Sequence, residues 1–189
     1  SRGLGDVYKR QLLGQLMKNY DTPIAVSGTH GKTTTTSMIS EVLLAADMDP
    51  TISVGGILKT IGGNIRVGKS GNFITEACEY TNSFLHFYPK ISVILNIEED
   101  HLDFFKDIDD IRHSFRRFAE LLPADGTLII NADTPKYEDI IRDLPCNVIT
   151  YGLEHDADYQ AADITYDKYG HASFSVLRNG VKVGLSLIH

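Results

Sequence analysis

A segment rich in glycine, lysine and threonine, residues 27–36, has the residue types needed to bind a nucleotide phosphate. A short apolar run at residues 23–26 precedes it, and residues 33–46 follow with apolar side chains at helical spacing. This order of strand, glycine loop and helix start brings backbone N–H groups and the positive end of a helix dipole to phosphate oxygens. The segment therefore predicts a phosphate-binding loop.

The side chains of this loop are expected to divide the work of binding. Lys32 would reach the β- and γ-phosphates, and the Thr33 hydroxyl would bind Mg²⁺. The other residues expected to contact the nucleotide are Gly28, Thr29, His30, Gly31 and Thr34. The spacing differs from the general pattern Gly-x-x-x-x-Gly-Lys-Ser/Thr, because Val26 stands five positions before Gly31. The simpler alternative is a helix start that happens to be rich in glycine and threonine.

Acidic and histidine side chains follow two further predicted strands. Glu76 ends the run at residues 73–75, and the polar cluster at residues 98–103 ends the apolar run that starts at residue 91. Ligands of open α/β sheets bind at the carboxyl ends of strands, so we expect these groups to share a crevice with the loop. Thr33 and Glu76 suit a first Mg²⁺, and the ring of His101 suits a second metal nearer the acceptor. A solvated Glu76 and a surface or helix-capping His101 remain the alternatives.

Strands and helices alternate through most of the chain, which predicts a mostly parallel α/β sheet flanked by helices. The expected strands are residues 23–26, 51–54, 73–75, 91–97, 127–131 and 147–151, and the expected helices are residues 12–17, 33–46, 108–122 and 134–144. Asp107 is expected to cap the third helix. Beyond residue 159, three short strands at residues 164–167, 171–177 and 181–185 predict a small antiparallel β meander with an Asn-Gly turn.

Composition excludes several classes of function. The 189 residues carry a formal net charge of -7, which argues against nucleic acid as the main partner. No apolar run approaches the length needed for insertion into a membrane. Cys78 and Cys146 have no metal-ligand spacing and are expected to stay reduced in a cytoplasmic protein.

Three segments together resemble the Mur ligase family, the ATP-dependent amide-forming enzymes of peptidoglycan synthesis. The loop reads Gly-Thr-His-Gly-Lys-Thr, and residues 96–103 resemble the family's Asn-x-x-x-Asp-His-x-Asp motif, in which the histidine binds a metal. His101 occupies that position. Glu76 matches the first residue of the family's Glu-Ala-Asp-Glu segment, although Cys78 replaces the usual aspartate.

The resemblance implies a central ATP-binding domain over residues 12–184, with a parallel α/β part at 12–158 and an antiparallel part at 159–184. It also implies ATP and Mg²⁺ as cofactors and an acyl-phosphate intermediate. UDP-N-acetylmuramate and L-alanine are the implied substrates, since the helix predicted over residues 108–122 lacks the lysine that other branches carbamylate. Lys32, Glu76 and His101 would be the catalytic residues. Gly56, Asn64 and Arg66 would face the sugar-nucleotide acceptor, with turn formation as the alternative role of the last two.

The N- and C-terminal domains of the same enzyme are the implied partners. Residues 1–11 and 185–189 show no pattern that continues into the neighbouring elements, and we interpret them as a non-native leader and tail. The alternatives are a murein-peptide recycling ligase of the same family, a kinase or other NTPase with a similar loop, and a regulatory nucleotide-binding module. Residues 83–86 favour the alanine-adding branch.

Overall fold

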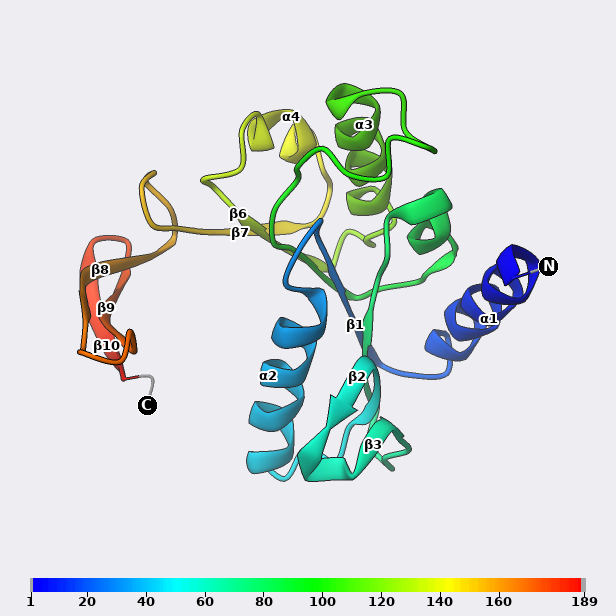
Figure 1. The fold of residues 1–189 in the computed structure, drawn as a ribbon, viewed down its shortest axis with the longest axis horizontal. Coiled ribbons are helices and arrows are strands. Elements are labelled where there is room, and N and C mark those ends of the chain that lie inside the picture. The colour runs from blue at the N-terminus through cyan, green and yellow to red at the C-terminus, as the bar shows by residue number, and fades with distance from the viewer. Residues whose placement is uncertain (1, 188–189) are drawn as a thin grey trace.

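One ten-stranded sheet, in the order β10-β9-β8-β7-β6-β5-β1-β4-β2-β3, forms the centre of the computed structural model, which describes residues 2–187 (Figure 1). Its parallel part consists of β7 (Asn147–Gly152), β6 (Thr127–Asn131), β5 (Ile91–Ile94), β1 (Thr22–Ser27), β4 (Asn72–Glu76) and β2 (Thr51–Leu58). The predicted mostly parallel α/β sheet is therefore confirmed. The carboxyl ends of β1, β4 and β5 meet at one edge of the sheet, because their neighbours run in register.

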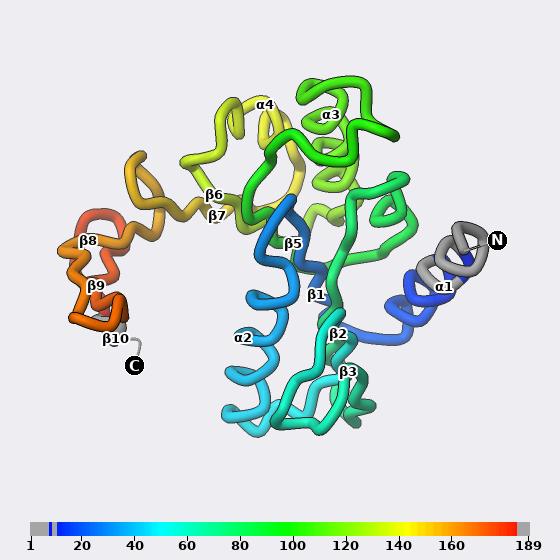
Figure 2. The backbone as a smooth tube through the Cα atoms, in the orientation of Figure 1, coloured from blue at the N-terminus to red at the C-terminus, as the bar shows by residue number. Residues whose placement is uncertain are grey.

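Helices lie on both faces of this sheet. They are α1 (Arg2–Met17), α2 (Lys32–Ala45), α3 (Ile108–Ala119) and α4 (Tyr137–Ile141), with two 3-10 turns, η1 (Lys59–Ile61) and η2 (Tyr80–His86). The backbone trace shows α2 on one face and α3 and α4 on the other (Figure 2). No helix within residues 2–187 is long and apolar enough to cross a membrane.

Two apolar clusters fill the two faces, because side chains alternate between the faces along each strand. On the α3 side, Phe84 of η2 stacks on Phe118 with ring centroids 4.6 Å apart and meets Phe115 edge to face at 5.4 Å. On the α2 side, Ile24 and Val26 of β1 belong to the second cluster. The apolar stripe predicted for the third helix is thus confirmed as a core face.

Local signals placed some element ends correctly and missed others. Asp107 caps α3 as predicted, because its carboxylate accepts a hydrogen bond from the Asp110 N–H at 2.9 Å. The helix predicted over residues 134–144 was wrong in extent: α4 covers only Tyr137–Ile141. Lys136, with φ of 62°, precedes it in the left-handed region, and Arg142 follows it with extended ψ of 128°, so neither end continues the helix.

The glycine-rich region after β2 is more regular than predicted. Residues 55–58, expected in turns, extend β2, and β3 (Gly63–Arg66) pairs with it in an antiparallel hairpin. The antiparallel meander is confirmed as β8 (Tyr159–Tyr166), β9 (Ala172–Arg178) and β10 (Val181–Leu187). The backbone of the predicted tail therefore pairs as far as Leu187, and α1 begins at Arg2 within the predicted leader; the origin of both segments stays a prediction.

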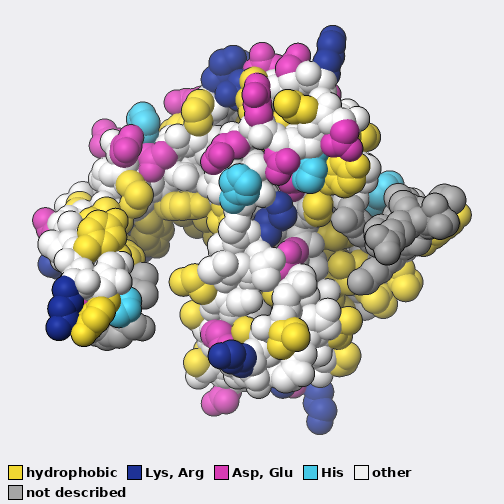
Figure 3. Space-filling view, viewed as in Figure 1, with side chains coloured by type: hydrophobic (Ala, Val, Ile, Leu, Met, Phe, Trp, Pro, Cys, Tyr) yellow, Lys and Arg dark blue, Asp and Glu magenta, His cyan; other side chains and the backbone are white. Residues whose placement is uncertain are grey.

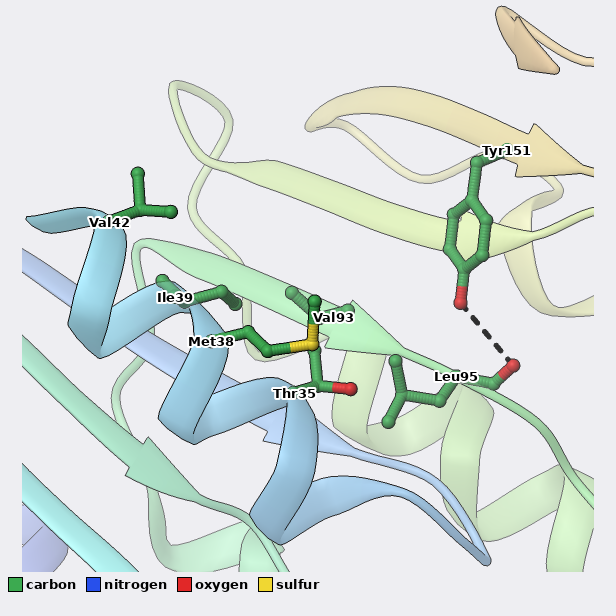
Figure 4. A pocket seen from close by; sticks show the side chains of 7 residues that line it. All are labelled: Thr35, Met38, Ile39, Val42, Val93, Leu95 and Tyr151. Atoms are coloured by element: carbon green, nitrogen blue, oxygen red, sulfur yellow. Dashed lines mark hydrogen bonds between the residues drawn. The ribbon is translucent and has the colours of Figure 1, made fainter. Parts of the chain in front are cut away.

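An open apolar pocket of about 490 Å³ lies between α2 and the sheet, beside β5 and β7 (Figure 4). Met38 and Val42 of α2 line it with exposed fractions of 59% and 67%, and Tyr151 of β7 faces it. The Tyr151 hydroxyl donates a hydrogen bond to the Leu95 carbonyl at 3.4 Å. Burial raises the pKa of Tyr151 to about 12, so this hydroxyl stays protonated at neutral pH.

A carboxylate clamp ties the loop between β7 and β8 to the end of β6. Asp133 accepts hydrogen bonds from the N–H groups of Leu153, Glu154 and His155 at 2.6, 3.1 and 2.9 Å, and from the His155 ring at 2.9 Å. Burial opposes ionisation of Asp133, but these donors outweigh it and lower the pKa of Asp133 to about 2. The ionised carboxylate is therefore favoured in the folded protein.

We expect Asp133→Asn to lower the free energy of unfolding at pH 7 by about 1–3 kcal/mol. Because folding lowers this pKa from 3.8 to about 2, the carboxylate stabilises the fold above pH 4 and loses that effect as pH falls toward 2. The difference between wild type and variant should therefore shrink between pH 5 and about pH 3 in urea unfolding. Asp156→Asn, which removes the same charge from the same loop, is the control. A difference that does not change with pH would contradict this account.

Candidate functional site

The phosphate loop connects β1 to α2 and is held in shape by its neighbours. Gly28 has φ of 145°, and a Cβ there would lie 2.9 Å from the Leu95 Cβ, so both the conformation and the space require glycine. The Thr29 N–H donates to the Asn96 carbonyl at 3.1 Å, and the Asn96 side chain binds the backbone of His30 at 2.8 and 3.1 Å. Asn96 therefore fixes the loop, and it is a positioning residue that motif reading alone did not single out.

His30 contributes to this loop mainly through its backbone. Its ring is well exposed, and the Nε2 atom lies 3.8 Å from the carboxylate of Glu98. The Glu98 N–H also donates to the Thr29 hydroxyl at 2.9 Å. The segment after β5 thus supports the loop from the side, as the shared crevice predicted.

Lys32, the first residue of α2, points back across the loop. Its ammonium group donates to the carbonyls of Gly28 at 2.5 Å and Thr29 at 3.0 Å. It also forms an ion pair with Glu79, whose nearer carboxylate oxygen lies 3.1 Å away. Glu79 is only 2% exposed, so this pair is largely removed from solvent.

A first group of oxygen atoms lies at the start of α2. The Thr33 hydroxyl donates to one oxygen of Glu76 at 3.1 Å, and the Gly55 N–H donates to the other at 2.5 Å. A Cβ on Gly55 would lie 2.9 Å from Glu76, so glycine permits the strands to approach here. Thr33 and Glu76 therefore lie together as predicted, with oxygen atoms of the kind that Mg²⁺ prefers.

A second group surrounds His101, beyond Lys32. Glu79, Asp100 and His101 each offer a ligand atom, and these atoms lie within 4.8 Å of one another. His101 Nε2 is 3.7 Å from Glu79, and His101 Nδ1 is 3.8 Å from Asp100. His101 has φ of 53°, a left-handed conformation that turns the chain into this position. Two carboxylates and an imidazole fit a divalent cation.

Tyr80 covers the outer side of His101. The two rings lie 4.5 Å apart, and the Tyr80 hydroxyl donates to Asp103 at 2.8 Å. This hydrogen bond to a carboxylate raises the pKa of Tyr80. Acidic and histidine side chains gather on the face of the molecule above the start of α2 (Figure 3). The site thus combines one basic loop with an acidic rim, as a metal–phosphate complex requires.

A sequence model of the Mur ligase middle domain matches residues 26–188, which include every element of this site. The chain belongs to the Mur ligase family. The UDP-N-acetylmuramate–L-alanine ligase of Lachnospira eligens is 60% identical over 181 residues, which make up 95% of this chain and 39% of that relative. The chain therefore spans well under half the length of this curated Mur ligase.

Solved Mur ligases share the fold. The Neisseria meningitides UDP-N-acetylmuramate:L-alanyl-gamma-D-glutamyl-meso-diaminopimelate ligase aligns with a TM-score of 0.81 and 29% identity, over 93% of this chain and 58% of that one. The UDP-N-acetylmuramate–alanine ligase of Thermotoga maritima aligns with a TM-score of 0.78 and 25% identity, over 95% of this chain and 39% of that one.

The acceptor residues predicted for this Mur ligase domain divide into two groups. Gly56 lies beside the loop, since a Cβ there would be 3.2 Å from the Thr33 side chain. Asn64 is exposed on β3 near the hairpin turn. The structure does not bring Arg66 to the site, because Arg66 pairs with Ile52 near the amino end of β2. Its guanidinium instead forms an ion pair with Asp49 at 2.5 Å.

Glu79 and Asp100 are the metal-ligating candidates that sequence reasoning passed over. Glu79 is the second glutamate of the Glu-Ala-Cys-Glu segment, and Asp100 is the aspartate of the Asp-His pair. Both stand in the motifs that carried the resemblance, so a signal existed. We had assigned the catalytic carboxylate to Glu76, whereas the structure places Glu79 between Lys32 and His101.

Proposed function

We propose that this chain is the ATP-binding part of an enzyme that joins L-alanine to UDP-N-acetylmuramate in peptidoglycan synthesis. The observation that carries the proposal is the meeting of Lys32, Glu79 and His101 at the carboxyl edge of the parallel sheet. The family and the 60% identity to a ligase of that name support the choice of reaction.

The chain's own residues suit the first step, in which the muramyl carboxylate attacks the γ-phosphorus of ATP and ADP leaves. The loop N–H groups and Lys32 bind the transferring phosphoryl group, whose charge spreads over its oxygens. The acyl phosphate then loses phosphate when the amine of L-alanine attacks its carbonyl carbon and forms the amide. These residues orient the phosphoryl group and offset its charge, while the amine and the sugar nucleotide require the rest of the enzyme.

Mg²⁺ would supply further charge compensation on the phosphates. Thr33 and Glu76 would hold one ion near the loop, and Glu79, Asp100 and His101 would hold another on the acceptor side. We also infer a cytoplasmic location, since Cys78 and Cys146 are both free thiols.

The second candidate is a murein-peptide ligase of the same family, which the similarity to the Neisseria meningitides structure supports. A ligation assay of the full-length enzyme decides between the two. We expect phosphate release and amide formation with UDP-N-acetylmuramate and L-alanine, and at least tenfold less product with the tripeptide acceptor of the recycling reaction. A preference for the tripeptide would replace the first proposal with the second.

The 189-residue chain alone is expected to fold and not to ligate. The continuous core on both sheet faces favours folding, whereas the chain holds only the phosphate and metal part of the site. Ligation needs ATP, a carboxylate and an amine oriented together with water excluded. The measurement is amide product from the chain with ATP, Mg²⁺, UDP-N-acetylmuramate and L-alanine. Product at an ordinary enzymatic rate would show that the site is self-contained.

A further inference from the structure

The phosphate-binding lysine has no hydrogen available for a phosphate in this structure. An ammonium group has three N–H donors. Lys32 directs them to the Gly28 carbonyl, the Thr29 carbonyl and the carboxylate of Glu79, at 2.5, 3.0 and 3.1 Å. Its side chain is 16% exposed. Binding a phosphate through Lys32 therefore requires that at least one of these contacts break.

The contact with Glu79 is the one whose loss matters most. Glu79 is 2% exposed, and a buried carboxylate without a cation is strongly disfavoured. Its other polar neighbour, His101 Nε2, lies 3.7 Å away, beyond an ordinary hydrogen bond. Lys32 therefore supplies most of the charge compensation for Glu79, and a metal-free anion that draws Lys32 away leaves Glu79 buried and unpaired.

We propose that Glu79 acts as an exchangeable anchor, which holds Lys32 in the empty loop and releases it when a divalent cation binds between Glu79 and His101. The cation then compensates Glu79, and the ammonium group is free to bind the phosphates. The anchor would select the metal–triphosphate complex over the free triphosphate. This inference rests on the proposed metal site for its second half, while the hold on Lys32 is independent of that site.

The first test measures binding of metal-free tripolyphosphate to the 189-residue chain in EDTA, by calorimetry. Glu79→Gln frees Lys32 and should raise the affinity about tenfold, within the usual range of coupling between two sites. Glu76→Gln is the matched control, because it removes the same charge beside the loop from a residue bound to Thr33 and Gly55. We expect its effect to stay below about threefold.

A double-mutant cycle separates release of Lys32 from a general change in charge. In a Lys32→Met background, Glu79→Gln should no longer raise the affinity for tripolyphosphate. An equal gain in both backgrounds, an equal gain from Glu76→Gln, or no binding by wild type and Glu79→Gln alike would overturn the proposal. Circular dichroism establishes that each variant compared is folded, and Lys32→Arg replaces Lys32→Met if the latter unfolds.

The second test measures Mn²⁺ binding without any phosphate, by electron paramagnetic resonance. Lys32→Met removes the competing cation from Glu79 and should raise the affinity for Mn²⁺ about fivefold or more. Lys90→Met, whose ion pair with Asp125 lies elsewhere, should leave it unchanged. Unchanged Mn²⁺ affinity in Lys32→Met would overturn the exchange. Binding that His101→Ala fails to weaken would instead count against the metal site in the proposed function.

Discussion

Lys32→Ala in the full-length enzyme is expected to lower the rate of acyl-phosphate formation by three or more powers of ten, about 4 kcal/mol of transition-state stabilisation. Lys32 starts α2 at the phosphate loop, and its ammonium is the cationic side chain that this loop directs toward bound phosphate. Removal leaves the developing phosphoryl charge without that partner. Single-turnover measurement of phosphate transfer in the presence of hydroxylamine, which traps the acyl phosphate, reports this step directly.

The control for this experiment must separate lost chemistry from lost structure, because Glu79 loses its cation in the same variant. Thermal unfolding should show a folded Lys32→Ala enzyme at the assay temperature. Lys90→Ala, which breaks an ion pair with Asp125 outside the site, should keep ordinary turnover. Turnover of Lys32→Ala within about tenfold of wild type would remove the phosphate-loop assignment.

Glu79→Ala is expected to reduce kcat about 100-fold or more, and Glu76→Ala only about tenfold. Glu79 is buried between Lys32 and His101, so its loss affects both the lysine and the acceptor-side cation. Glu76 is bound to Thr33 and Gly55 at the edge of the loop, and excess Mg²⁺ should partly rescue its variant. The ranking of the two carboxylates is the sharp point of the comparison.

His101→Ala provides the matched measurement for Glu79→Ala. We expect it to lower kcat more than it weakens ATP binding, because the cation it would hold lies on the acceptor side. Steady-state kinetics at several Mg²⁺ concentrations, with ATP affinity measured separately, tests all three variants. A larger loss from Glu76→Ala than from Glu79→Ala would return the principal role to Glu76, as the sequence alone had suggested.

Local sequence pattern was sufficient for much of the fold. The loop glycines, the Asp107 cap and the apolar stripe of α3 each act over a few neighbouring residues, so their signals survive without knowledge of the fold. The alternation of strands and helices likewise determined the parallel sheet and its helical layers. Where the local signal was ambiguous, as at Lys136 with its left-handed φ, the predicted helix was too long.

The functional assignments divide in the same way. Composition and motif order identified the phosphate loop, Thr33 with Glu76, and His101 beyond the next strand. The choice between Glu76 and Glu79 required the tertiary structure, because strand periodicity stops at the end of β4 and no local rule orients residues beyond it.

Only the tertiary structure could bring Glu79 to Lys32, 47 residues earlier in the chain. The parallel register of β4 on β1 brings their carboxyl ends together, and the burial of Glu79 makes a nearby cation necessary. The same register carries Arg66 to the far end of β2, away from the acceptor role that its motif suggested. Sequence thus determined which chemical groups this protein carries, while strand register and burial decided which of them meet, because those depend on contacts between residues far apart in the chain.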